Sequence, residues 1–230
     1  MHALDMLYTE YPFFGSRRMQ GALKDGYGIQ ICREHVQHLM RRMGIEAIYP
    51  HPRTSIPDPQ HRIYPYLLRN LAITKPNQVW GTDITYIRIS QGFCYLTAIL
   101  DWFSRTVLAW EVSERMETSF CATSLRSALT RAIPEIHNSD QGAQFTSHEY
   151  TGILAARGVA ISMDGRGRCM DNIFTERLWR TVKYEDVYLN NYRTIDEVRE
   201  GLASYFSFYN EKRRHQSLDN KTPAQVYCAG

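Results

Sequence analysis

The sequence has few cysteines and no long hydrophobic run. Its five cysteines, at positions 32, 94, 121, 169 and 228, are scattered and form no CxxC pair, which argues against a disulfide framework and a cysteine zinc site. The longest apolar stretch, residues 95–100, ends at Asp101 and is far too short to cross a bilayer. The first residues lack the basic, apolar and small-residue zones of a signal peptide. These absences predict a cytoplasmic location.

A strong net charge is also missing. The 230 residues carry a formal charge of only +3, but residues 1–75 hold ten Lys and Arg against six Asp and Glu, whereas residues 76–190 hold eleven against thirteen. A basic front beside a mildly acidic middle fits a polyanion-binding module next to a metal-dependent catalytic domain. An ordinary fluctuation of charge explains the asymmetry equally well. Hydrophobic residues are plentiful, at 43% of the chain, so a packed core is feasible and wholesale disorder is excluded.

The first 48 residues predict a small helical unit. Ser16 is placed to cap a helix that ends near Asp25-Gly26, and residues 33–43 have helical spacing with Gly44 in the position of a C-terminal cap. The apolar side of this second helix comprises Val36, Leu39, Met40 and Met43, and its other side comprises Arg33, His35, His38, Arg41 and Arg42. A basic helix face predicts a helix-turn-helix-like DNA-binding unit. A small packing unit with solvated arginines has equal weight.

Residues 49–77 contain six prolines, which prevent a regular helix or a central strand. This composition predicts an extended linker and the main domain boundary of the chain. We therefore expect a helical segment at 1–48, a linker at 49–77, a catalytic core at 78–190 and a C-terminal helical extension at 191–230.

After residue 78 the pattern becomes that of a mixed α/β domain. Three strands with short links are expected at 80–89, 93–100 and 106–112, followed by a helix near 118–131, a strand at 135–138, a helix near 147–157, a strand at 159–162 and a long helix from about 172. This order predicts an antiparallel meander within a mixed sheet that is flanked by helices. Thr194 and Thr222 are placed to cap two further helices.

Three carboxylates fall at informative positions of this sheet. Asp83 lies inside the first strand, where aspartate is uncommon, Asp140 directly follows the fourth strand, and Glu176 lies in the first turns of the long helix. Three converging carboxylates can hold two magnesium ions about 3.5–4 Å apart for phosphoryl transfer. Singly, each has a more ordinary explanation, as a strand-edge residue, a turn residue or a helix N-terminal charge. Their joint placement weakens those explanations.

Three blocks of the sequence resemble the integrase core of insertion-sequence transposases, in particular the second-reading-frame product of the IS3 family. The blocks are residues 78–87, 137–145 and 167–179, which contain Asp83, Asp140 and Glu176 in turn. The 35 residues between Asp140 and Glu176 match the D,D(35)E pattern of that family. Residues 11–19 resemble its helix-turn-helix-like segment, and residues 209–224 resemble its C-terminal end.

This resemblance implies an α/β fold of the RNase H type, in which helices flank a mixed five-stranded sheet, with a small N-terminal helical unit. It implies that Asp83, Asp140 and Glu176 bind two Mg²⁺ or Mn²⁺ ions and catalyse DNA cleavage and strand transfer. It adds DNA contacts by Lys183, seven residues after Glu176, and by Arg180, one turn away. Without the family pattern, Lys183 would be an ordinary surface lysine.

The implied partners are the DNA of the element ends and of the target, with a homo-oligomer assembled on them in the nucleoid of a bacterial cell. In the family, a frameshift fusion supplies an upstream helix-turn-helix and leucine zipper, so we expect terminal-repeat recognition to need chain beyond this sequence. Two other functions stay open: a nuclease of the same fold that hydrolyses without joining, and a catalytically incomplete fragment that binds DNA and inhibits transposition.

Overall fold

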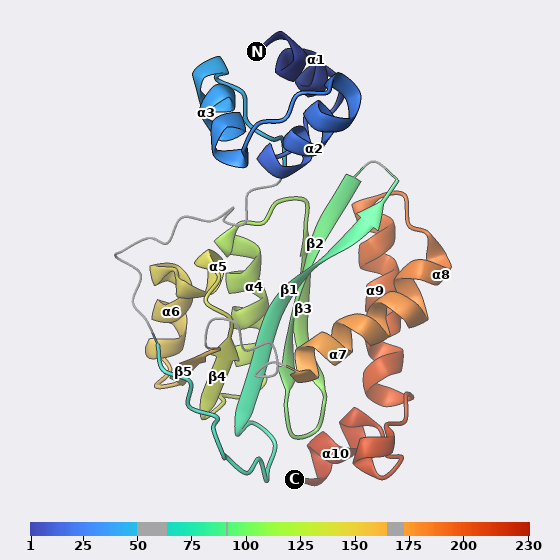
Figure 1. The fold of residues 1–230 in the computed structure, drawn as a ribbon. Helices are drawn as coiled ribbons and strands as arrows, with labels where there is room; N and C mark the ends of the chain where they lie inside the picture. Colours follow the sequence, from blue (N-terminus) through green and yellow to red (C-terminus); the bar gives the residue numbers. More distant parts are fainter. Residues whose placement is uncertain (50–63, 91, 165–172) are drawn as a thin grey trace. The chain divides into compact units, whose positions relative to one another are not determined.

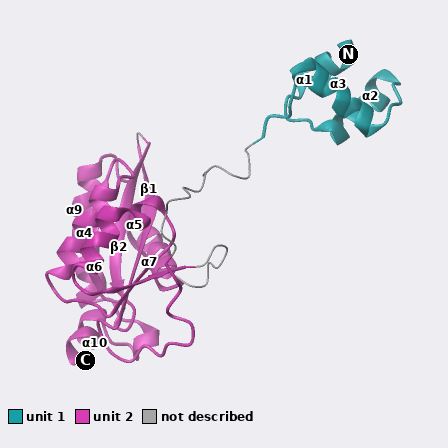
Figure 2. Ribbon diagram, turned by 90° about the vertical axis from the view of Figure 1, so that its left-hand side faces the viewer, with its two compact units in different colours: residues 1–58 teal, residues 59–230 magenta. Residues whose placement is uncertain are grey.

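The computed structural model describes residues 1–49, 64–90, 92–164 and 173–230. The chain divides into two units, Met1–Asp58 and Pro59–Gly230 (Figure 2). Three expected features fall wholly or partly outside the described residues: the first half of the proline-rich linker, the turn residue Gln91, and positions 167–172 of the third sequence block.

The N-terminal unit contains three helices, α1 (His2–Glu10), α2 (Ser16–Tyr27) and α3 (Arg33–Met43). Their inward side chains form one small core, which consists of Leu4, Leu7, Met19, Leu23, Val36 and Met40. Gly44 caps α3 in the left-handed conformation, as the sequence predicts. The expected end of α2 was wrong: the helix continues past Asp25-Gly26 to Tyr27, because Gly28, at φ 65°, supplies the left-handed cap.

The second unit is built on a five-stranded sheet in the order β3-β2-β1-β4-β5 (Figure 1). The strands are β1 (Val79–Ile89), β2 (Gly92–Asp101), β3 (Val107–Ser113), β4 (Ile136–Ser139) and β5 (Ala160–Met163). The first three pair in antiparallel fashion, whereas β4 is parallel to β1 and β5 is parallel to β4. The mixed five-stranded sheet that the sequence predicts is therefore confirmed.

Helices cover both faces of the sheet. One face carries α4 (Thr118–Leu129), α5 (Ala143–Thr146) and α6 (His148–Ala155); the other carries α7 (Ile173–Val182), a π-helical segment η2 (Lys183–Val187), α8 (Tyr188–Asn190) and α9 (Ile195–Glu211) (Figure 1). A 3₁₀ turn η3 (Gln216–Leu218) and α10 (Pro223–Ala229) complete the unit. None of the helices in the described part of the chain is long and apolar enough to span a membrane.

Alternate residues of β1 belong to different cores. Val79 and Ile87 pack into the cluster that includes Leu178 of α7, whereas Trp80 packs into the cluster on the α4 side. Because successive side chains of a strand point to opposite faces, the odd-numbered positions of β1 face α7. Asp83 is one of these positions, which directs its carboxylate toward that helix.

Part of the expected linker packs within the second unit. Leu68 is buried in the α7-side core. The Leu67 N–H donates to Ser162 Oγ at 3.0 Å, and the Met163 N–H donates to Pro65 O at 3.2 Å. The prolines prevent a regular ladder, but isolated hydrogen bonds and one buried leucine still attach residues 65–68 to β5.

Candidate active site

The register of two parallel strands directs Asp83 and Asp140 toward the same place. Val79 of β1 pairs with Ile136 of β4, and Gly81 pairs with Asn138; each pair is 57 positions apart, which is also the interval between Asp83 and Asp140. β4 ends at Ser139, one residue before Asp140. If the register continued by two residues, Asp140 would lie opposite Asp83, with both side chains on the same face.

The helix α7 brings the third carboxylate to this face. Trp179 Nε1 donates a hydrogen bond to Asp83 Oδ2 at 3.0 Å, which joins α7 directly to β1. Glu176 lies three positions before Trp179 and therefore points from the same side of the helix. The Ile84 N–H donates to Asp83 Oδ1 at 2.8 Å, so both oxygens of the Asp83 carboxylate have a donor.

The charges of both other candidate carboxylates act on Asp83. Burial is the main reason that the pKa of Asp83 is raised to about 6, and the negative charges of Asp140 and Glu176 add to it. The hydrogen bonds from Trp179 and Ile84 oppose this rise. Burial also raises the pKa of Asp140, although this residue is more exposed than Asp83. The Gly142 N–H donates to Asp140 Oδ1 at 2.8 Å and opposes that rise.

The donor set suits hard divalent cations. Carboxylate oxygens are the ligands that Mg²⁺ and Mn²⁺ prefer, and each oxygen can accept more than one bond, so Asp83 retains lone pairs beyond those used by Trp179 and Ile84. The raised pKa of Asp83 comes first from burial and then from the neighbouring negative charges of Asp140 and Glu176, which a bound cation would offset. Within the described ranges, no three His, Cys, Asp or Glu side chains are close enough together to hold one ion.

Lys183 stands beside the carboxylates, and Arg180 lies further out. Lys183 is half-buried, with Nζ 5.1 Å from the centroid of the Tyr86 ring. Burial lowers its pKa, and the negative charge of Asp83 opposes that change. Arg180 is exposed, with its guanidinium 6.0 Å from the Tyr184 ring. The expected spacing of two α-helical turns is modified, because the helix becomes π-helical at Lys183.

The sequence analysis did not assign Trp179 or Tyr86 to the site. Trp179 holds Asp83, and Tyr86 lies under the Lys183 ammonium group. Spacing was an available signal for Trp179, which is three residues after Glu176 on one helix. No such signal exists for Tyr86, because a residue three positions from Asp83 on a strand points to the other face.

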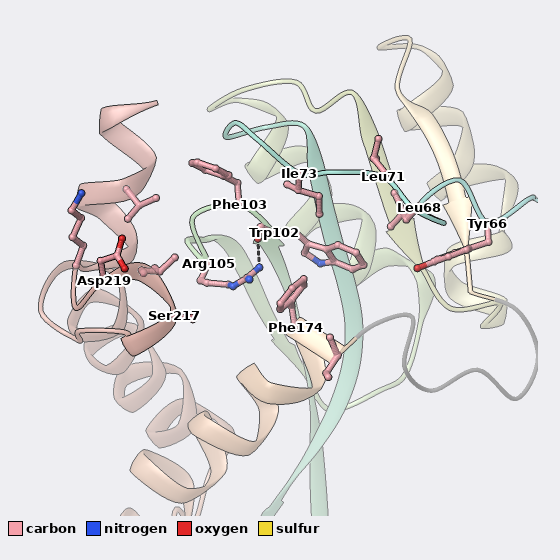
Figure 3. A pocket seen from close by; sticks show the side chains of 14 residues that line it. Tyr66, Leu68, Leu71, Ile73, Trp102, Phe103, Arg105, Phe174, Ser217 and Asp219 are labelled. Atoms are coloured by element: carbon pink, nitrogen blue, oxygen red, sulfur yellow. Dashed lines mark hydrogen bonds between the residues drawn. The ribbon is translucent and has the colours of Figure 1, made fainter.

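An open cavity of about 700 Å³ lies beside the first turn of α7 (Figure 3). The Arg105 guanidinium stacks on the ring of Phe174 at 3.4 Å and donates to the carbonyl oxygen of Trp102. Burial lowers the pKa of Arg105 to about 10. Phe174 precedes Glu176 by two residues, so this stacking connects the β2–β3 turn to the start of the helix that carries a candidate catalytic group.

The N-terminal arginines do not share one face. Arg41 and Arg42 are exposed, but Arg33 is half-buried, and its buried Nε has no hydrogen-bond partner among the described residues. At 100° per residue, Arg33 falls beside the apolar stripe of α3 and nearly opposite Arg42. The structure thus separates Arg33 from the basic face to which the sequence analysis assigned it.

Comparison with known proteins supports the same interpretation. Family models described as "Integrase core domain" match residues 73–169 and 157–223, and one described as "HTH-like domain" matches residues 1–53. The chain is 31% identical over 218 residues to the "Insertion element IS600 uncharacterized 31 kDa protein" of Shigella sonnei, covering 92% of this chain and 80% of that protein. It is 30% identical to the "Putative transposase InsK for insertion sequence element IS150" of Escherichia coli K12, covering 92% and 76%.

Solved structures share the fold at lower identity. The catalytic core domain of HTLV-2 integrase, solved in complex with magnesium, aligns with a TM-score of 0.54 and 18% identity over 66% of this chain and 97% of that one. A chain of the simian T-cell lymphotropic virus intasome aligns with a TM-score of 0.59 and 17% identity over 98% and 74%. Together with the family models and relatives, the fold and the carboxylate face lead to one assignment: the chain belongs to the insertion-sequence transposases with an integrase core domain, enzymes of the DDE transposase and integrase class.

Proposed function

We propose that Asp83, Asp140 and Glu176 are the catalytic residues of this transposase, which cleaves DNA at the ends of an insertion sequence and joins the cut ends to target DNA. The proposal is supported by the pairing register of β1 and β4, which directs Asp83 and Asp140 toward each other, and by the Trp179 bond that joins the helix of Glu176 to Asp83.

The three carboxylates would hold two Mg²⁺ or Mn²⁺ ions, which activate the attacking water or 3′-hydroxyl and stabilise the leaving oxygen. Trp179 and the Ile84 N–H orient the Asp83 carboxylate through one bond to each oxygen. Lys183 lies within the field of Asp83 and supplies a positive charge for the phosphate of a bound DNA end. Arg180 adds an exposed positive charge one turn earlier.

The partners in this proposal are the element ends and the target DNA. An element has two ends, so we include the assembly of at least two chains on the DNA. Arg41 and Arg42 of α3 are the exposed charges of the helix-turn-helix-like unit that would contact phosphates. The curated relatives named above are bacterial, and we place this enzyme in the bacterial cytoplasm, on the nucleoid.

A strand-transfer assay tests the proposal. Labelled DNA carrying both ends of the element that encodes this chain is incubated with target DNA and Mg²⁺. Asp83→Asn, Asp140→Asn and Glu176→Gln should each abolish cleavage and joining, a larger loss than the roughly 10–100-fold typical of residues that only support a metal ligand. Asp196→Asn, an 81% exposed carboxylate on α9, is the matched control and should react normally.

The products separate the alternatives. Cut ends without joined products would favour a nuclease that hydrolyses only. DNA binding without any cleavage by the unmodified chain would favour an inhibitory fragment. Full activity in any of the three carboxylate variants would show that the catalytic assignment is wrong.

A further inference from the structure

Four exposed aromatic rings gather next to the candidate catalytic residues. Tyr86 and Phe93 are 60% and 54% exposed near the end of the β1–β2 hairpin, and Tyr184 and Tyr188 are 65% and 61% exposed on the helix that follows Glu176. Single exposed aromatic residues are ordinary, but a connected group is characteristic of a binding surface.

Ring contacts connect these aromatic side chains to two cations. Tyr86 and Phe93 meet edge to face at 5.6 Å, and Tyr184 and Tyr188 do so at 5.3 Å. Lys183 Nζ lies 5.1 Å from the Tyr86 ring, and the Arg180 guanidinium lies 6.0 Å from the Tyr184 ring. We call Tyr86, Phe93, Arg180, Lys183, Tyr184 and Tyr188 the aromatic–cationic surface.

The charge of this surface is positive and available. Across the described ranges, the ion pairs involve neither Lys183 nor Arg180. Glu185, the nearest carboxylate in the sequence, is already bound by Arg213 at 2.6 Å and by the Tyr205 hydroxyl at 3.0 Å. Arg88, which pairs with Phe93 in the β1–β2 register, adds another exposed cation.

The helix places these side chains in a row that starts at the active site. Glu176, Arg180, Tyr184 and Tyr188 follow one another at intervals of four residues, which puts neighbours on the same side of a helix. The π-helical segment Lys183–Val187 lies within this row, and such segments often mark functional sites. A strand leaving the carboxylates could therefore follow cations and rings in succession.

We propose that the aromatic–cationic surface binds unpaired nucleotides of the DNA strand beside the reacting phosphate, with bases stacked on Tyr86 and Tyr184 and phosphates at Lys183 and Arg180. This inference rests on the proposed function, because it places DNA at Asp83, Asp140 and Glu176. Ring faces alternating with cations are the features by which proteins hold single strands. Base faces are accessible only where the duplex is open, so the surface selects an unpaired segment.

The test compares two DNA probes with the full-length chain. One is a duplex with a short unpaired 3′ tail that contains 2-aminopurine, and the other is the same duplex fully paired. EDTA is present throughout, so that binding is measured without chemistry. Tyr86→Ala and Tyr184→Ala should each weaken binding of the tailed probe roughly tenfold, about 1.4 kcal/mol, and reduce quenching of the 2-aminopurine, while the paired probe binds as before.

Matched variants separate stacking from folding. Tyr86→Phe and Tyr184→Phe keep the ring and should bind normally, whereas leucine at either position keeps apolar bulk without an aromatic face and should behave like alanine. Phe208→Ala removes a ring that is 44% exposed on α9, outside the surface, and should change neither probe.

Three results would overturn the inference: equal loss for both probes, no loss for the tailed probe, or leucine variants that bind like the unmodified chain. A drop from dimer to monomer in sedimentation, with tail binding retained, would instead assign the surface to contact with a second copy of the chain. A strand-transfer assay distinguishes failure of this inference from failure of the proposed catalytic function. Tyrosine variants that bind and join normally, beside an inactive Asp83→Asn, overturn only the role of the surface.

Discussion

Trp179 Nε1 lies 3.0 Å from Asp83 Oδ2, and this hydrogen bond joins the strand that carries one candidate catalytic carboxylate to the helix that carries another. Asp83 therefore depends on α7 for its orientation, and Glu176 depends on the same contact for its position relative to β1. Asp83 and Trp179 are 96 positions apart in sequence, so their hydrogen bond joins distant segments around the α7-side core.

Replacing Trp179 with phenylalanine tests this contact. Phenylalanine retains an aromatic ring in the core but cannot donate and is smaller, so the variant should lose roughly 1 kcal/mol for the hydrogen bond and a further amount for the cavity. Because the Trp179 bond lowers the pKa of Asp83, that pKa should rise above its present value of about 6. A ¹³C NMR titration of the carboxyl group in EDTA measures this shift. An unchanged midpoint would show that the bond is not formed in solution.

Asp83 also makes the stability of the metal-free protein depend on pH. Its folded pKa, about 6, lies above the ordinary value of 3.8, so the folded chain binds the proton more tightly than the unfolded chain. The associated stability is fully present below about pH 3.8 and is lost as the pH rises through 6. The unmodified chain should thus lose roughly 1–2 kcal/mol relative to Asp83→Asn over this window, allowing for solvent at a half-buried site.

Urea unfolding at several pH values in EDTA measures that difference. Above about pH 7 the two curves should run parallel, because Asp83 is then ionised in both states. Magnesium should restore stability to the unmodified chain and not to the asparagine variant, since only the folded carboxylate site binds the ion. A pH-independent difference would contradict the raised pKa.

Gly81 is required by the close packing of an indole ring two residues before Asp83. A Cβ at Gly81 would lie 2.1 Å from Trp102 Nε1, so Gly81→Ala must displace a buried tryptophan. We expect a loss of about 1–3 kcal/mol and reduced strand transfer. Gly152→Ala on α6 is the control: nothing lies within 4 Å of its Cβ, so this helix position should gain up to about 1 kcal/mol. Thermal unfolding of both variants measures the contrast.

The sheet was predictable because its strands obey local rules. Alternating apolar residues define β1, and short links make an antiparallel meander the simplest arrangement for β1, β2 and β3. The order of the strands predicted that Asp83 and Asp140 belong to neighbouring parts of the sheet, but it did not predict which residues are paired. Their register depends on which residues of β1 and β4 pair, and this is decided by packing across the whole sheet.

Other features depend on tertiary contacts that no local pattern contains. The bond from Trp179 to Asp83 links distant segments, and the change to a π-helix at Lys183 has no signature in the spacing. Thr194 caps α9 as predicted, because its hydroxyl oxygen accepts from the Glu197 N–H, but the Glu197 carboxylate accepts from the N–H of Arg193. The half-burial of Arg33 was not predictable from a list of basic residues, because such a list ignores the angle at which each side chain leaves the helix.

Arg41 and Arg42 should contribute to DNA binding through phosphates. Both are exposed on α3, so Arg41→Ala together with Arg42→Ala should leave the fold intact and weaken binding to any duplex. The log–log dependence of affinity on salt should become shallower by about 0.9 for each phosphate contact that is lost. Arg33→Ala should instead change stability more than the salt dependence, because this side chain is half-buried. An unchanged slope in the double variant would favour a purely structural role for the helical unit.

Arg105 offers a direct test of how the β2–β3 turn supports α7. Its backbone is left-handed, at φ 65°, and its guanidinium lies 3.4 Å from the Phe174 ring centroid. Arg105→Ala loses the stacking and keeps the unfavourable backbone, whereas Arg105→Gly loses the same stacking but relaxes the backbone. We expect alanine to cost about 2 kcal/mol, and glycine to be less destabilising by roughly 1 kcal/mol.

Both variants should impair strand transfer alike, because each frees the first turn of the helix that holds Glu176. Thermal unfolding and strand-transfer rates, with the 81% exposed Arg115→Ala as control, separate the two effects. If the glycine variant recovers activity in proportion to its stability, Arg105 supports only the fold and has no part in positioning Glu176.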